Sequence, residues 1–527
     1  MPEIKASDEI RTEFSDRGHP KGLYVLFATE MWERFNYYGM RAILIFYMTQ
    51  ALVFNDAFAS NLYGSYIGLI YLSALLGGYI ADRFWGNRRS IIIGGLVMAV
   101  GEFILFYSGT IFKSNVDLST FMLFLGLGFM IAGNGFFKPN ISSMVGQLYP
   151  KGDRRIDPAY TIFYMGINIG GALGPLACGL VGQTGNPADF KWAFLVGGIG
   201  MLISVVVQLL FQDKYVRSPE GALLGTIPTK EVKEAGVVKT VNAAPKAWFQ
   251  TPAIIIGMIL LSFFCMGILY VDAKVFSFMS YLLIVSVLYI AFVVFFDKTL
   301  TRAEKERVGV IFVVSFFVIF FWAAYEQTGA SLNLFAERQT DRQLGSYTIP
   351  ASFFQSLNSI FVIIFAPAFA FLWLKMGKRE PSAPTKMALG LLLLALGYWW
   401  IAYGVSTASS GAKVSMIWLF GMYALHTWGE LSLSPIGLSL VNKLSPLKFS
   451  SLLMAVWFLS NAAGNKLAGV LSSLFPGEKP TSFLGYQMKD TYDFFMLFVF
   501  MGGIAALILF LLSKRLKRMM HMETRQQ

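Results

Sequence analysis

Residues 30–41 read EMWERFNYYGMR and lie inside a long apolar segment that begins near residue 22. Glu30, Glu33, Arg34 and Arg41 recur at spacings of three, four and seven, so a helix places them on one face. An ionised side chain at the centre of a bilayer costs at least about 2.5–3.5 kcal/mol and normally faces a cavity or a partner. The stretch therefore predicts a membrane helix with a polar stripe turned toward the protein interior.

The composition of the whole chain supports this interpretation. Of the 527 residues, 55% are hydrophobic and only 14% are Asp, Glu, Lys or Arg, against about 25% charged residues in globular domains. Apolar segments of about twenty residues, long enough to cross a bilayer, recur along the chain and exclude a soluble protein. We expect fourteen spans, at 22–50, 59–81, 90–111, 118–147, 159–183, 191–211, 251–271, 276–296, 307–335, 349–374, 385–404, 414–441, 450–473 and 492–513.

The positive charge is distributed unevenly between the two ends of these spans. Of the 43 lysines and arginines, 31 fall in, or at the edge of, segments on the side of the N-terminus, and 8 fall on the opposite side. Cytoplasmic loops carry such an excess, so both termini are expected in the cytoplasm of a cell with an inner (cytoplasmic) membrane. The net charge of +12 is thereby explained without a nucleic-acid partner.

The spans form two groups of six separated by an insertion. We expect a cytoplasmic N-terminus at 1–21, a six-helix bundle at 22–212, a linker with an inserted helix pair at 213–300, a second bundle at 301–513 and a cytoplasmic tail at 514–527. Asp272 and Lys274 are expected in the turn between the inserted helices, whose spans carry no charge. We therefore interpret this pair as a scaffold.

Three further charged residues lie deep in predicted spans. Lys138 directly precedes Pro139, which frees a backbone carbonyl and kinks a helix where a water-lined cavity tolerates it. Glu326 and Glu430 have no counter-ion on their own helices, so the cations of the first bundle are their available partners. Making and breaking such pairs can load and release a proton, which is the physical basis of proton coupling.

The sequence gives little support for enzymatic catalysis or metal binding. No nucleophile–base pattern, nucleotide-binding glycine motif or cluster of metal ligands is present, so we expect neither an enzyme nor a metal site. Cys178 and Cys265 fall within spans and are interpreted as buried apolar side chains. His426 is expected to be a packed residue, and Lys466 has no obvious partner.

Several motifs resemble one transporter family. EMWERFNYYG matches the ExxERFxYYG pattern on the first helix of the proton-dependent oligopeptide transporter family, part of the major facilitator superfamily. GNGFFKPNISSMVGQLY and FYMGINIGGALGPL resemble the fourth and fifth helices of that family, and GGYIADRFWGNRR resembles the superfamily loop between helices two and three. The resemblance covers essentially the whole chain. It implies the major facilitator fold, with two six-helix bundles around a central cavity plus the inserted hairpin typical of bacterial members.

The resemblance also implies roles for individual residues. Those that would contact a bound peptide are Arg34, Tyr38, Tyr71, Lys138, Asn168, Trp322, Asn358, Glu430 and Trp457. Among them, Arg34 and Lys138 would receive the peptide carboxylate, and Glu430 would receive the amino group. Those implied in proton coupling are Glu30, Glu33, Arg34 and Glu326. The implied gates are a pair Arg41–Glu326 on the outer side and a pair Lys138–Glu430 across the bundles.

Two positions depart from related sequences. Eukaryotic members carry a histidine on the second helix where this chain has Gly64, so coupling is expected to fall on carboxylates. Some bacterial members carry a second acid immediately before Glu326, and here that residue is Tyr325. The expected coupling network is therefore shorter.

The sequence thus predicts a proton-coupled symporter that imports di- and tripeptides by alternating access, with no cofactor besides the coupling proton. Its expected partners are short peptides, protons and the lipid bilayer. A transporter of another anionic or drug-like solute stays open as the alternative. A membrane enzyme would need a nucleophile–base pair, which the sequence lacks.

Overall fold

The computed structural model describes residues 18–150, 152–226, 229–234, 237–242, 251–274, 277–408, 412–477 and 480–521. The predicted N-terminus up to residue 17, parts of the linker and the tail beyond residue 521 lie outside the described residues. Fourteen helices of at least 18 residues are present in the described part, as the sequence predicted. Eleven helical segments are long and apolar enough to cross a membrane.

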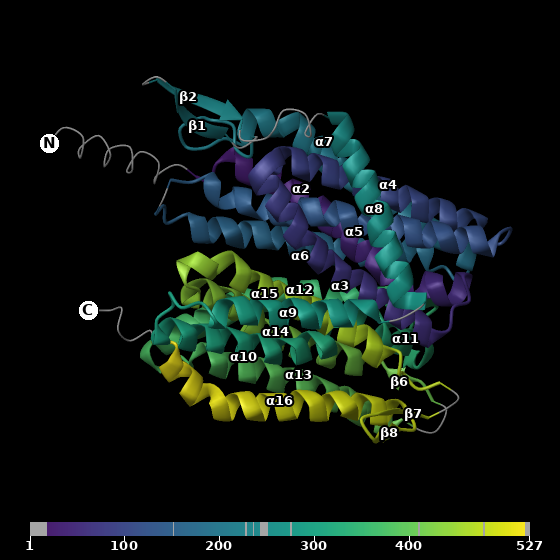
Figure 1. The fold of residues 1–527 in the computed structure, drawn as a ribbon. Helices are drawn as coiled ribbons and strands as arrows, with labels where there is room; N and C mark the ends of the chain where they lie inside the picture. The colour runs from purple at the N-terminus through teal and green to yellow at the C-terminus, as the bar shows by residue number, and fades with distance from the viewer. Residues whose placement is uncertain are drawn as a thin grey trace.

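Two groups of helices form the two halves of the molecule (Figure 1). The first comprises α2 (Lys21–Phe46), α3 (Asp56–Ile80), α4 (Asn87–Ile111), α5 (Val116–Gln147), α6 (Ile156–Gly182) and α7 (Phe190–Tyr215). The second comprises α10 (Arg302–Tyr325), α11 (Ser331–Arg338), α12 (Phe354–Met376), α13 (Ala383–Thr407), α14 (Ile417–Leu444), α15 (Ser450–Ser472) and α16 (Thr491–Met519). The predicted all-α membrane fold of two helix bundles is confirmed.

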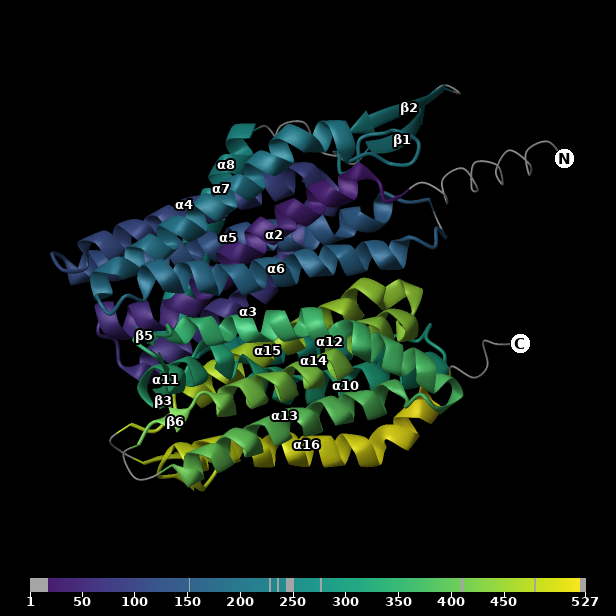
Figure 2. The ribbon, with the colours of Figure 1, turned by 180° about the vertical axis from the view of Figure 1, so that it is seen from behind.

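The two bundles meet through two helix pairs, α3 with α15 and α6 with α12. We call the side where α2 begins and α16 ends the terminal side, and the opposite side the far side. The start of α2 and the end of α16 lie at the same end of the molecule in Figures 1 and 2. Three of the fourteen long helices, α2, α14 and α15, are too polar to be counted among the eleven apolar segments. Each of them carries charged residues that are described below.

The inserted hairpin consists of α8 (Thr251–Lys274) and α9 (Phe278–Phe295). Asp272 was expected in the turn but lies in the last turn of α8, because this helix runs three residues further than predicted. Beyond α9, the Lys448 ammonium and the Thr299 hydroxyl hold the pKa of Asp297 well below its usual range. Lys448 Nζ lies 2.6 Å from Asp297 Oδ2, which ties the end of the hairpin to the start of α15.

The short strands all lie outside the membrane-crossing helices. The antiparallel pairs are β1 (Thr229–Glu234) with β2 (Val237–Asn242), β4 (Gln343–Leu344) with β5 (Tyr347–Thr348), and β7 (Thr481–Phe483) with β8 (Tyr486–Met488). A parallel bridge joins β3 (Thr340–Asp341) to β6 (Val414–Ser415). Among them, only β1 and β2 lie within the linker that separates the two bundles.

Side chains define where several helices begin. The Asn55 side chain accepts a 2.7 Å hydrogen bond from the Phe58 amide and caps α3. At the start of α10, Thr301 and Glu304 form a reciprocal capping box, in which the Thr301 amide donates to Glu304 Oε2 at 2.8 Å. These caps satisfy amides that the helices themselves leave unpaired.

The predicted span 307–335 is not one continuous helix. α10 ends at Tyr325, a 3₁₀ turn follows at Glu326–Gly329, and α11 begins at Ser331. The Gln327 side chain donates to the carbonyls of Ala323 and Ala468, at 2.9 and 3.1 Å, and thereby supports the break. The break places Glu326 at a helix end rather than on a continuous helix surface.

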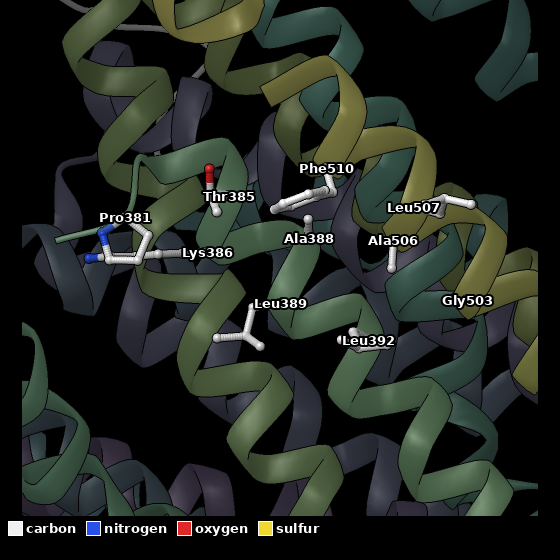
Figure 3. A pocket seen from close by; sticks show the side chains of 10 residues that line it. All are labelled: Pro381, Thr385, Lys386, Ala388, Leu389, Leu392, Gly503, Ala506, Leu507 and Phe510. Atoms are coloured by element: carbon white, nitrogen blue, oxygen red, sulfur yellow. The ribbon is translucent and has the colours of Figure 1, made fainter. Parts of the chain in front are cut away.

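A cavity of about 400 Å³ lies between α13 and α16. Its walls are mostly apolar and include Leu389, Leu392 and Phe510, and Lys386 lies at its edge (Figure 3). Lys386 pairs with Glu380. Because α13 and α16 form the side of the second bundle away from the first (Figure 1), this cavity is separate from the charged residues between the bundles.

Candidate functional site

The polar stripe on α2 forms a buried cluster of charges. Arg34 Nε lies 2.9 Å from Glu30 Oε1 and 2.6 Å from Glu33 Oε2. Asn134 on α5 donates to Glu33 Oε1 at 2.9 Å. All four side chains are almost completely buried. One guanidinium thus serves two carboxylates through Nε, while Arg34 Nη2 is buried without a hydrogen-bond partner among the described residues and is a donor that a further anion could use.

Two turns further along α2, Arg41 joins the two bundles. It forms an ion pair with Glu326 and donates to the Tyr63 hydroxyl on α3. Arg41 and Glu326 are 6% and 5% exposed. The pair that the resemblance implied is therefore present, and it closes the far side.

Other contacts close the same side. Ser356 on α12 donates to the carbonyl of Ala172 on α6 at 2.7 Å, and Arg338 at the end of α11 pairs with Asp56 at the start of α3. Among the described residues, the hydrogen bonds that join the two bundles all fall in the far halves of the helices. In this conformation, hydrogen bonds join the two bundles on the far side, and the described residues form none between the bundles on the terminal side.

Lys138 lies on α5, which continues through Pro139 as a helix. Its ammonium lies 4.7 Å from the ring centroid of Tyr71 on α3 and is partly exposed. The implied Lys138–Glu430 pair is not formed in this conformation, since none of the ion pairs among the described residues includes Lys138, and it stays a prediction for other conformations. The terminal halves of the bundles, which would have to approach for that pair to form, are apart.

Glu430 on α14 is held by neutral donors. The Tyr325 hydroxyl donates to Glu430 Oε2 at 2.5 Å, and the Asn358 amide donates to the same oxygen at 3.0 Å. Asn358 also donates to the Thr427 hydroxyl at 3.2 Å. No described cation pairs with Glu430, and the carboxylate is partly exposed. It is therefore oriented and available to a positively charged group.

Residues of both bundles approach Glu430. Tyr38 on α2 and Tyr164 on α6 lie within electrostatic reach of its carboxylate. Asn168 donates to the Tyr164 carbonyl at 2.9 Å. One turn further along α6, a Cβ placed on Gly171 would lie 2.5 Å from Ser359 Oγ on α12 and 3.2 Å from the Tyr38 ring. Tyr38 and Tyr164 of the first bundle thus lie close to Glu430 of the second bundle.

The two tryptophans differ in their surroundings. Trp322 is partly exposed and packs edge-to-face on Tyr325, with ring centroids 5.3 Å apart. Trp457 is 3% exposed and covers Gly437 on α14. In this conformation Trp322 is placed to form a wall beside Glu430, whereas Trp457 is packed within the second bundle.

Comparison with known proteins agrees with this arrangement. The family model described as "PTR2: POT family" matches residues 88–488. The chain belongs to the POT family. It is a multi-pass membrane transporter.

POT-family relatives match along nearly the whole chain. "Peptide transporter YePEPT" of Yersinia enterocolitica is 34% identical over 472 residues, which cover 86% of this chain and 88% of that protein. A "Di-/tripeptide transporter" of Lactococcus lactis is 32% identical over 525 residues, covering 97% and 98%. A crystal structure of a mutant of the peptide transporter POT in complex with alafosfalin has a TM-score of 0.78 at 31% identity, covering 98% and 99%.

Two polar residues received no role in the sequence analysis. Tyr325 was noted only as a position where some relatives carry an acid, but its hydroxyl forms the shortest hydrogen bond to Glu430. Glu102 on α4 is fully buried, and both its oxygens lack a hydrogen-bond partner among the described residues. An acid in the middle of span 90–111 was the signal that could have identified it.

The remaining unassigned side chains are now placed. His426 is buried with its ring centroid 4.8 Å from that of Tyr398 and 6.3 Å from that of Tyr325. Cys178 and Cys265 are buried free thiols. A search of the described residues gives no group of three or more His, Cys, Asp or Glu that could hold a metal ion.

Proposed function

We propose that this POT-family chain is a proton-coupled symporter that imports di- and tripeptides by alternating access. The observation that carries the proposal is a pair of charges, Lys138 on one bundle and Glu430 on the other, neither of which pairs with an opposite charge in the described part of the protein. Buried charges are normally paired. A ligand that carries both an ammonium and a carboxylate supplies the missing partner to each.

A short peptide has this chemistry at its two ends. Its ammonium would bind Glu430, whose carboxylate is oriented by Tyr325 and Asn358. Its carboxylate would bind Lys138 and the unpartnered Nη2 of Arg34, in competition with Glu30 and Glu33 for that guanidinium. Since the charges at the two ends fix the backbone, the aromatic residues between them need only accommodate different side chains.

Proton coupling would follow from the α2 cluster. When a peptide carboxylate takes hydrogen bonds from Arg34, Glu33 loses a partner and binds a proton in the low-dielectric interior. A proton on Glu326 would likewise weaken its pair with Arg41 and allow the far side to open. Substrate and proton thus act on one network of ion pairs that also joins the bundles.

The orientation of the chain would make this transport an import. With the terminal side in the cytoplasm, as the excess of basic residues predicts, the far side faces outward across an inner membrane. A potential of 100 mV contributes about 2.3 kcal/mol per charge moved, which is sufficient to drive accumulation.

Uptake by reconstituted liposomes tests the proposal. Radiolabelled dialanine should accumulate under an inward proton gradient and an inside-negative potential, in competition with unlabelled tripeptides but not with free alanine. The dialanine should be recovered intact, which distinguishes transport from hydrolysis. If dialanine neither accumulates nor exchanges while another anionic or drug-like solute does, the peptide assignment is wrong.

A further inference from the structure

The two arms of the inserted hairpin are attached to different bundles. α8 packs on α5 and α3 of the first bundle, and α9 packs on α15 of the second. Figure 1 shows α8 along the first bundle and α9 along the second. The Lys448–Asp297 ion pair anchors the end of the α9 arm to the second bundle. The hairpin therefore crosses the interface that has to open and close.

At the far end of this hairpin, one carboxylate contacts three elements. Lys466 Nζ on α15 lies 2.6 Å from Asp272 Oδ2, the Ser65 hydroxyl on α3 donates to the same oxygen, and the Met279 amide at the start of α9 donates to Oδ1 at 2.8 Å. Lys466 also donates to Ser65 at 2.8 Å. Asp272 and Lys466 are 6% and 3% exposed.

The surrounding packing excludes water from this pair. A Cβ placed on Gly64 of α3 would lie 2.6 Å from the Gly469 Cα of α15. A Cβ on Gly68 would lie 2.2 Å from the terminal methyl of Met279, which is fully buried. In such surroundings an ion pair interacts strongly, and each charge is costly without the other.

We propose that Asp272 and Lys466 form a second far-side lock, separate from Arg41–Glu326, and that the hairpin is a strap that carries this lock across the two bundles. The inference rests on the proposed alternating-access cycle. When α15 moves away from α3, Asp272 stays with α8 and the first bundle and loses Lys466. Opening then loses the attraction between the two charges, which is strong in this low-dielectric site, so the intact pair favours the closed far side.

The consequence for variants is a shift in conformation. In Asp272→Asn or Lys466→Gln, one charge is left buried without its partner when the far side is closed, and it reaches water when that side opens. The ratio of far-side-open to far-side-closed molecules should rise roughly tenfold or more, given the cost of an unpaired buried charge. Exchange of the two charges in Asp272→Lys/Lys466→Asp should restore the closed state.

Distances between spin labels measure this ratio. The labels are attached to cysteines introduced at Lys113 and Lys489, exposed far-side positions on the first and second bundles, in a full-length chain whose Cys178 and Cys265 are replaced by serine. The measurement is made in liposomes without peptide or gradient. Lys274→Gln is the matched control, since Lys274 also lies in the last turn of α8 but is exposed, and it should leave the distances unchanged.

The outcomes discriminate clearly. A shift to longer distances in both single variants, reversed in the exchange variant, supports the lock. Unchanged distances in either single variant, or an exchange variant that folds but stays open, overturn it. Should a single variant fail to fold, the neutral pair Asp272→Asn/Lys466→Met is measured, and unchanged distances there also overturn the lock. Because no solute is present, these results are independent of dialanine uptake by the unmodified protein, which tests the proposed function separately.

Discussion

Arg41 in α2 and Glu326 at the end of α10 form a buried ion pair across the two bundles. The Tyr63 hydroxyl accepts a further hydrogen bond from the arginine, so three elements meet at one guanidinium. Because neither charge reaches water in this conformation, the pair favours the closed far side as long as Glu326 is ionised.

Glu326→Gln should therefore open the far side. In a variant with the native cysteines replaced by serine, a cysteine at Ala330, which is 1% exposed, should react with a water-soluble maleimide roughly tenfold faster once the charge is removed. Glu306→Gln, on the terminal part of the same helix, is the control and should not change the rate. An unchanged rate in Glu326→Gln would show that the pair is not a gate.

Glu33→Gln should separate proton coupling from peptide binding. The single amide oxygen can replace only one of the two carboxylate oxygens that face Arg34 and Asn134, and the amide can carry no proton. Gradient-driven accumulation of dialanine should be lost, while exchange of labelled for unlabelled dialanine should persist within about threefold, because uniform binding is retained. Asp117→Asn, an exposed acid on α5, should preserve both activities. Proton-driven accumulation by Glu33→Gln would remove Glu33 from the coupling role.

Glu430→Gln should weaken binding at the amino end of the peptide. Loss of a charge-assisted contact costs about 1.5–3 kcal/mol, or roughly ten- to hundredfold in affinity. Competition against labelled dialanine should show this loss for dialanine and a much smaller one for an analogue without the amino group. Tyr325→Phe, which keeps the charge and removes one donor, should cause a smaller loss. Equal losses for both ligands in Glu430→Gln would refute the amino-end assignment.

The sequence predicted those features that a single helix encodes. The spacing of Glu30 and Arg34 places them one turn apart on α2, and they are bonded there at 2.9 Å. The spans were predictable because each must cover the apolar thickness of a bilayer. Arg41–Glu326 required the family resemblance, since 285 positions separate the two residues.

The features that were not predicted depend on how the bundles face each other. Lys466 had no obvious partner in the sequence because Asp272 was assigned to the turn between the inserted helices, whereas α8 extends past it and carries it against α15. The Lys138–Glu430 pair, which the resemblance implied, is not formed in this conformation. Periodicity in one helix carries no information about either distance.

Glu102 should be neutral in the folded protein. Both its oxygens are fully buried and have no hydrogen-bond partner of ordinary geometry among the described residues. An ionised carboxylate there would be unsolvated, whereas a protonated carboxyl carries no charge to solvate. Glu102→Gln should therefore leave the melting temperature in detergent within about 2 °C and remove a protonated-carboxyl C=O band from the infrared spectrum. A fall of more than about 5 °C would show that the native group is charged.

Gly64→Ala should prevent full closure of the far side. The added Cβ would lie 2.6 Å from the Cα of Gly469 and 2.8 Å from the Asn465 carbonyl oxygen, and backbone atoms on two packed helices cannot give way as a flexible side chain can. The spin-label distance between the far ends of the bundles should lengthen, and dialanine uptake should fall. Gly503→Ala on α16 is the matched control, because nothing lies within 4 Å of the added Cβ. The higher helix propensity of alanine should stabilise the protein by up to about 1 kcal/mol and leave the spin-label distance unchanged. If Gly64→Ala closes as the unmodified protein does, the close approach of α3 and α15 is not required for closure.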